Sequence, residues 1–162
     1  MKRILTYSAC CFAIVAAEPA LAATAQDSLN VTANYQPSCT IATVNGVDFG
    51  TITSLASDVT EVTAGTINVQ CSAGAGYQIT TNDGANASGA QKRMVDVGGT
   101  NFLNYQIYSD AGHATTWQTS FSANDQTGDG GNNPFQVYGK ITGGQTVPTG
   151  AYSDTVVFTV NY

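Results

Sequence analysis

The chain has 162 residues, of which 10% are charged and 43% are hydrophobic, and its formal net charge is −6. Coiled coils need many charged residues and nucleic-acid binders need a basic surface, so both classes are excluded. A disordered chain is excluded as well, because 8 Tyr and 6 Phe supply apolar groups for a folded core. The composition predicts one acidic, weakly charged globular domain.

The first 22 residues have the three parts of a secretory signal peptide. Lys2 and Arg3 precede an apolar run over residues 4–17, and the small-residue pattern Ala-Leu-Ala ends at Ala22. This run is shorter than the roughly 20 residues of a membrane span, so the mature chain is not expected to insert into a membrane. We expect cleavage after Ala22, with Ala25 as a second option. Cleavage after Ala22 leaves 3 basic and 10 acidic residues.

The mature chain keeps two cysteines, Cys39 and Cys71, in a compartment that oxidises thiols. A zinc site needs about four ligands, and His113 is the only histidine of the chain. In an exported protein, a pair of cysteines is far more often a disulfide than a metal site. The sequence therefore predicts a Cys39–Cys71 disulfide.

Nearly every apolar segment of the mature chain alternates with a period of two and is rich in Val, Ile, Thr, Tyr and Phe, which predicts half-buried strands. Turns rich in glycine and asparagine separate the segments at intervals of about ten residues, as in a sandwich or barrel. No segment has the spacing of a helix. In chain order, the expected strands are residues 29–35, 39–44, 47–52, 66–71, 77–81, 94–97, 102–109, 135–141 and 152–162.

No constellation of side chains indicates an enzyme, a cofactor or a metal centre. His113 lies in a turn with no placed nucleophile beside it, and we expect it to be solvated. Residues 124–133 are the most loop-like part of the chain, and they hold Asp125 and Asp129 without the spacing of a calcium loop. Trp117 is expected in the core rather than on a sugar-binding surface.

Two predicted strands, residues 29–35 and 152–162, carry almost no charge, with Asp154 as their one charged residue. Residues 29–35 follow a small, polar leader, and one face of this strand carries Leu29, Val31, Ala33 and Tyr35. The C-terminal strand alternates up to the last residue, and one of its faces carries Val156, Phe158, Val160 and Tyr162. Proteins normally protect a long apolar edge strand with Lys, Pro or a covering element. The C-terminal strand is therefore either internal to its sheet or pairs with a strand of another chain.

These segments resemble the spore coat protein U domain family and, within it, the subunits of archaic (Csu-type) chaperone-usher pili. The resemblance runs over the whole mature chain. Its more specific parts are the two cysteine positions, residues 103–110 (LNYQIYSD) and residues 150–162 (GAYSDTVVFTVNY), and it also includes CTI at 39–41, VDFGT at 47–51 and INVQC at 67–71.

The resemblance implies an all-β protein, an immunoglobulin-like β-sandwich that lacks its last strand and is completed by a donor strand from a neighbouring subunit. It implies a signal peptide over 1–22, a donor-strand extension over 23–36 and a sandwich domain over 37–162. By position, the donor side chains would be Leu29, Val31, Ala33 and Tyr35. The strand that borders the groove and pairs with a chaperone would carry Val156, Phe158, Val160 and Tyr162.

The implied partners are neighbouring subunits of the same polymer, a periplasmic chaperone and an outer-membrane usher, with no nucleic acid and no cofactor. The implied location is a fimbrium at the cell surface, reached through the periplasm, where the fibre supports adhesion and biofilm formation. One alternative is an autonomous exported sandwich that binds carbohydrate through Trp117 or the loop 124–133, with residues 29–35 as its own first strand. A second alternative, within the same family, is a coat component of a resting cell.

Overall fold

The computed structural model describes residues 23–162, and the predicted signal peptide, residues 1–22, lies outside this range. The chain divides into two units between Asn34 and Tyr35. In the first unit, residues 23–34 are exposed and form no regular secondary structure. The predicted strand over 29–35 is not formed, because a strand needs a hydrogen-bonded neighbour and residues 29–34 have none among the described residues.

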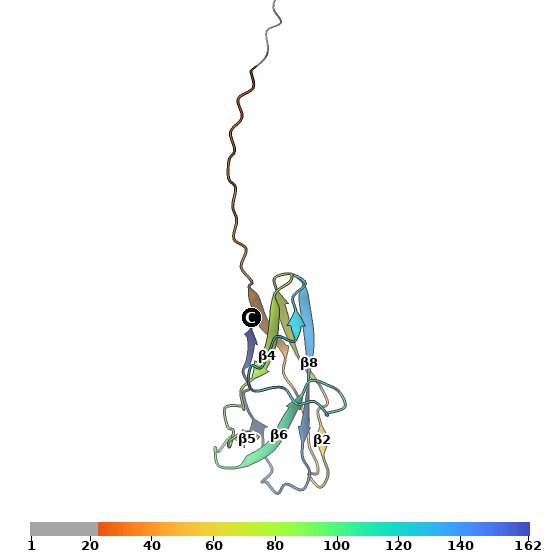
Figure 1. Cartoon of the computed structure of the whole chain (residues 1–162). Coiled ribbons are helices and arrows are strands. Elements are labelled where there is room, and N and C mark those ends of the chain that lie inside the picture. Colours follow the sequence, from red (N-terminus) through yellow and green to blue (C-terminus); the bar gives the residue numbers. More distant parts are fainter. Residues whose placement is uncertain (1–22) are drawn as a thin grey trace, which may run out of the picture. The chain divides into compact units, whose positions relative to one another are not determined.

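The second unit is built from strands, and residues 23–162 contain no helix (Figure 1). No described segment is therefore a helix long and apolar enough to cross a bilayer. In chain order, the strands are β1 (Cys39–Asn45), β2 (Val59–Thr60), β3 (Gly65–Cys71), β4 (Gly76–Thr81), β5 (Lys92–Asp96), β6 (Phe102–Tyr108), β7 (Gln126–Thr127), β8 (Asn132–Ile141), β9 (Tyr152–Ser153) and β10 (Phe158–Asn161).

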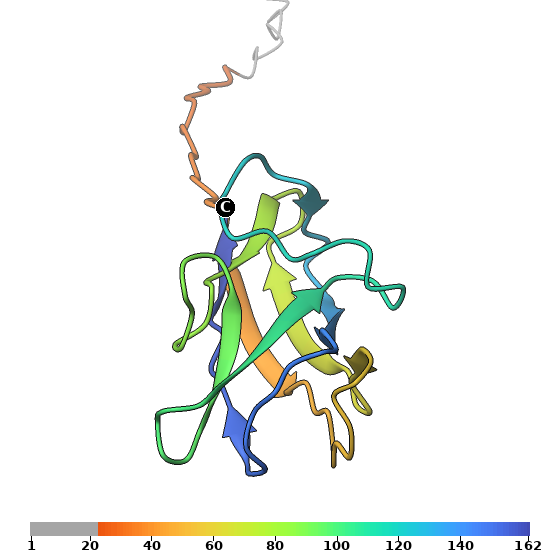
Figure 2. The ribbon, with the colours of Figure 1, turned by 90° about the horizontal axis from the view of Figure 1, so that it is seen from below.

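The strands form two sheets, and their pairings are antiparallel (Figure 2). The larger sheet has the order β1-β3-β8-β6-β5-β9, with β2 on β8, and the smaller sheet has the order β10-β4-β7. Val69 of β3 and Tyr77 of β4 are 0% and 2% exposed and belong to the same apolar cluster, so the core lies between the sheets. This all-β sandwich confirms the expected fold class.

Six of the nine expected strands form close to their expected positions. Their alternating apolar and polar residues favour a strand with one buried face. In β3, for example, Ile67, Val69 and Cys71 are buried on one face. Cys39 and Cys71 lie directly opposite each other in the β1–β3 ladder and are disulfide-bonded, which confirms the predicted pair.

Three expectations about elements need correction. The strand expected over 47–52 is reduced to a bridge between Asp48 and Thr63, because the chain turns at Gly50 (φ 62°), whose N–H donates to the Asp48 carboxylate. The strand expected over 152–162 is divided into β9 and β10, which belong to different sheets. The region 124–133, expected to be a loop, contains β7 and the first residues of β8. The structure also contains a short strand, β2, that the sequence did not predict.

Candidate strand-binding groove

β1 and β10 are neighbouring strands that form no ladder with each other. β1 pairs only with β3, and β10 pairs only with β4, within the described chain. The two strands nevertheless lie side by side, as the brown and dark blue arrows of Figure 1 show. Each strand therefore leaves one row of backbone N–H and C=O groups without a partner strand, and the two rows are on the same side of the sandwich.

The inward face of β1 is partly open to solvent at this place. Ile41 lies opposite Val69 in the β1–β3 ladder, so both side chains point to the same face of the sheet. Val69 is fully buried, whereas Ile41 remains 37% exposed. An interior-facing isoleucine with that exposure indicates that the layer that would cover it is incomplete.

A groove of about 900 Å³ lies between the segment that follows β1 and the segment that contains β9, and its lining includes no residue of β1 or β10. One wall is residues 47–55, which continue from β1, and the other wall is residues 145–154, which include β9. Met94, Leu103 and Ile141 form the floor. β9 is the edge strand of the larger sheet opposite β1, and the groove separates it from the segment that follows β1.

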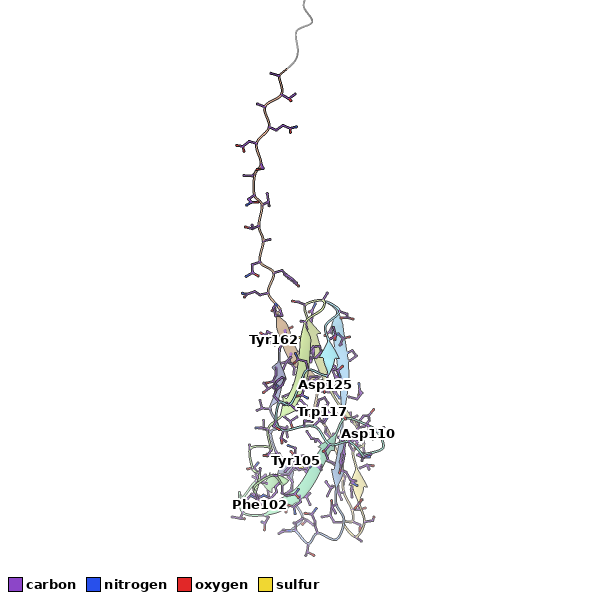
Figure 3. The ribbon with its side chains drawn as sticks, in the orientation of Figure 1. Phe102, Tyr105, Asp110, Trp117, Asp125 and Tyr162 are labelled. Atoms are coloured by element: carbon purple, nitrogen blue, oxygen red, sulfur yellow. A yellow bond between two sulfur atoms is a disulfide. The ribbon has the colours of Figure 1, made fainter. Side chains whose placement is uncertain are left out.

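The four C-terminal residues expected to border a groove are not among the residues that line this one, whose lining ends at Asp154. From Tyr152 to Val160 the chain alternates in burial, the even-numbered residues being half-buried and the odd-numbered ones exposed. Phe158 and Val160 pack against the core beside β3 and β4, and Val156 packs against the core beside β6 and β8. Tyr162 follows β10 and is 60% exposed (Figure 3). The side chains of the leader are more exposed still: Leu29 is 88%, Val31 85% and Tyr35 77% exposed, and Ala33 is exposed too.

The facing wall holds apolar side chains that the sequence alone did not assign to a groove. Val47, Phe49, Ile52 and Leu55 are half-buried and pack against the core. The sequence predicted a strand over residues 47–52 without assigning either of its faces to a groove. Only the spatial arrangement shows that this segment lies across from residues 145–154.

Trp117 is half-buried in the core, as expected. Its ring meets the Phe158 ring edge to face at a centroid distance of 5.3 Å, and its Nε1–H donates to the Tyr108 carbonyl oxygen over 2.9 Å. The indole therefore packs on β10 through Phe158. A separate cavity of about 190 Å³ lies beside Trp117 and is also lined by Ile79 and Phe135.

The carboxylates of the region 124–133 are held by neighbouring side chains and backbone. Asp129 accepts hydrogen bonds from the Gly131 N–H and the Asn133 amide, and Asp125 accepts one from Gln78. Within residues 23–162, no group of three His, Cys, Asp or Glu residues is placed to hold a metal ion.

His113 is not the solvated turn residue that the sequence suggested. Its side chain is 13% exposed, and its ring contacts the Tyr108 and Tyr138 rings edge-on at 5.3 and 6.2 Å between centroids. Its Nε2–H donates to the Glu61 carboxylate over 2.9 Å, and the same carboxylate oxygen accepts the Gly139 N–H. The turn folds back over the outer face of β6 and β8, which places this histidine beside a half-buried acid.

Glu61 should make the stability of the domain depend on pH. Burial opposes its charge, but the hydrogen bonds from His113 and Gly139 outweigh burial and lower the pKa of Glu61 below 4.5. A lowered pKa contributes stability above pH 4.5, and this contribution is lost as the pH falls through the folded-state pKa. We expect Glu61→Gln to lose about 1.5–3 kcal/mol of unfolding free energy at pH 7, measured by urea titration. The difference from the parent should shrink below pH 4.5, and a difference that is constant with pH would contradict this origin.

Comparison with known proteins gives consistent matches along the chain. The sequence model of the Spore Coat Protein U domain matches residues 25–159. Protein U of Myxococcus xanthus is 35% identical over 163 residues, which cover 92% of this chain and 91% of that protein. The family match spans residues 29–35 of the leader, the disulfide and both walls of the groove.

Two solved structures are similar. One is a chain in the CsuC–CsuE chaperone and tip adhesion subunit pre-assembly complex from archaic chaperone-usher Csu pili of Acinetobacter baumannii (TM-score 0.57, 26% identity). That match covers 78% of this chain, which spans only 40% of the length of that chain. The other is HdaB, the minor tip subunit of the E. coli Hda pilus (TM-score 0.41, 19% identity), with 75% of this chain and 79% of that chain covered.

Proposed function

Because the chain belongs to the spore coat protein U domain family, we propose that it is a structural subunit of a chaperone-usher pilus that polymerises by donor-strand exchange. The observation that carries this proposal is that β1 and β10 lie side by side without a ladder between them, and the groove lined by residues 47–55 and 145–154 supports it. In this function, the chain has no enzymatic activity. It is exported through the periplasm to a fibre at the cell surface, which supports adhesion and biofilm formation.

The leader has the chemistry of a strand that fills such a groove. Residues 29–35 extend over about 23 Å as a strand and carry their apolar side chains on one face. Burial of Leu29, Val31 and Tyr35 would stabilise the complex by roughly 1.5–3 kcal/mol for each large side chain. Ala33 would contribute less, because it is small. Ladders to β1 and β10 would satisfy the open backbone edges of both strands.

A groove on one subunit and a donor strand on the next form a head-to-tail contact. Such a contact does not close on itself, so it propagates into a filament. The same groove needs cover before assembly, and a periplasmic chaperone strand paired with β10 would supply it. The outer-membrane usher would then direct the replacement of this strand by the leader of the next subunit. The similarity to a structure of a chaperone–subunit pre-assembly complex supports the chaperone as a partner.

Two other functions make different predictions. An autonomous carbohydrate-binding sandwich would be a stable monomer that folds without its leader. This function draws little support from Trp117, because the indole packs on Phe158 and its N–H is already bonded. A coat component would polymerise through the same groove but would not require an usher. Genes for a chaperone and an usher beside this gene would favour the pilus.

The test of the proposed function uses the mature chain, residues 23–162, on denaturing gels without heating. We expect a ladder of multimers that collapses to the monomer on boiling, because strand-exchanged contacts are non-covalent but dissociate slowly. Deletion of residues 23–36 should abolish the ladder. Deletion of residues 23–26 alone is the matched control and should retain it, since all four donor side chains remain. If the mature chain and both deletion variants were all folded monomers, the proposal would be refuted.

A further inference from the structure

The C-terminal chain passes from one sheet to the other beside the groove. β9 pairs with β5, through Val95 opposite Ser153, whereas β10 pairs with β4, through Phe158 opposite Thr81. Residues 154–157, here called the crossing segment, connect the two pairings. The course of this segment determines whether β9 and β10 form one continuous wall.

The crossing segment is hydrogen-bonded to the turn that follows β4. Asn82 donates its N–H to the Val157 carbonyl oxygen over 3.0 Å, and its side-chain oxygen accepts the Val157 N–H over 2.9 Å. The Ala85 N–H donates to the Thr155 carbonyl oxygen over 3.0 Å. The side chain of Asn82 therefore acts in place of a backbone partner where the regular ladder has ended.

Two side chains in the interior, Lys92 and Tyr105, bind the turn after β4 and the crossing segment. Lys92 of β5 is 1% exposed, its Nζ donates to the Asn82 carbonyl oxygen, and the same Nζ lies 3.9 Å from the Asp83 carboxylate. Tyr105 lies opposite Lys92 on β6 and donates its hydroxyl to Asp154 over 2.7 Å. Asp154 also accepts the backbone and side-chain N–H groups of Asn86 and lines the groove.

Burial of Lys92 is costly, and its partners are few. Burial lowers the pKa of Lys92, although Asp83 and Asp154 act in the opposite direction, and burial together with the bond to Asp154 raises the pKa of Tyr105. The free-energy cost of moving an ammonium group out of water is offset only when the group is very well paired. Replacing a buried ion pair by apolar residues of similar volume often leaves the protein equally stable or more stable. The burial of Lys92 is therefore better explained by its orientation of the turn after β4 than by a gain in stability.

We propose that Lys92, with Tyr105, is a positioning residue for the groove. Through Asn82 and Asp154, the pair fixes the crossing segment so that the inward-facing side chains from Tyr152 to Val160 form one continuous wall before any strand enters. This inference rests on the proposed function. A preorganised wall strengthens binding because the incoming strand does not have to order it.

The test compares donor-peptide binding with stability. The acceptor in every arm is the mature chain carrying Val31→Asp, which prevents occupation of the groove by its own leader, and the probe is a labelled synthetic peptide of residues 24–36. With Lys92→Met we expect at least a tenfold loss of affinity with an unchanged or higher urea midpoint of unfolding. Tyr105→Phe should weaken binding at least threefold. Lys140→Met, at a partly exposed lysine of β8 that pairs with Asp58 and does not line the groove, is the matched control and should change affinity less than twofold.

The outcomes separate this inference from the proposed function. Failure of the parent acceptor to bind the peptide refutes the donor-strand function itself. Peptide binding that is equal in the parent and Lys92→Met, or that falls only in step with the unfolding midpoint, refutes the positioning role alone. Hydrogen exchange gives a readout that needs no peptide: the amides of Val157 and Ala85 should exchange at least tenfold faster in Lys92→Met, while those of β3 stay unchanged. Equal exchange at Val157 in both proteins also refutes the role.

Discussion

Val31→Asp should abolish polymerisation of the mature chain while leaving the domain folded. Val31 is 85% exposed in the free leader, so the substitution removes no contact within the subunit. In the donor strand, the same position would place an unpaired carboxylate in an apolar groove, at a cost of about 3–5 kcal/mol. The equilibrium constant for strand exchange should therefore fall by a factor of roughly 10²–10⁴, measured by multimer ladders and by light scattering.

The neighbouring residue provides the control for this experiment. Thr32→Asp adds the same charge one position away, on the face of the strand that points to solvent, so polymerisation should continue. Tyr35→Asp should behave like Val31→Asp, because positions of equal parity share a face. Both inward-facing variants should still bind the chaperone, since their own grooves are unaltered. Polymerisation of Val31→Asp at the parental rate would remove the leader from the donor role.

Removal of the disulfide, by Cys39→Ser with Cys71→Ser, should have the second largest effect. The bridge closes a sequence separation of 32 residues, and its loss should lower the free energy of unfolding by about 3–4 kcal/mol on the chain-entropy model. β1 is an edge strand that pairs only with β3 in the described chain, and the bridge fixes the end at which it begins. Its loss should therefore also loosen one wall of the groove and weaken binding of the peptide 24–36.

Reduction of the parent protein provides the matching control. A reducing agent should lower the urea midpoint of the parent to that of the double serine variant and leave the variant unchanged. Hydrogen exchange should increase first in the amides of β1, because the disulfide and one ladder hold this strand. A parent protein whose midpoint does not respond to reduction would contradict the contribution assigned to the bridge.

The sequence predicted most strands because the signal for a half-buried strand is local. The alternation of Ile67, Val69 and Cys71 is visible in the residue order, and the structure buries these three side chains together. The same signal failed at residues 47–52. There the apolar pattern predicted a strand, but the turn between Asp48 and Gly50 prevents a regular ladder.

Polar residues were harder to place than apolar ones. His113 was expected in solvent because a glycine-containing turn surrounds it, yet Glu61, distant in sequence, holds it against two tyrosines. Lys92 gave no local sign of burial, since lysine is almost never fully buried unless it is paired. Its burial depends on where the turn after β4 lies, and the residue order around Lys92 does not specify that position.

By itself, the sequence determined the all-β class, the disulfide and the alternation that places Val156, Phe158 and Val160 on one face, because composition, cysteine chemistry and a period of two are local properties. Only the tertiary structure decided that β1 and β10 are neighbours without a ladder and that residues 47–55 face residues 145–154 across a groove. It also decided that Lys92 lies behind that groove. These relations depend on which distant segments meet, and that follows from how the curled sheets pack against each other rather than from any one segment.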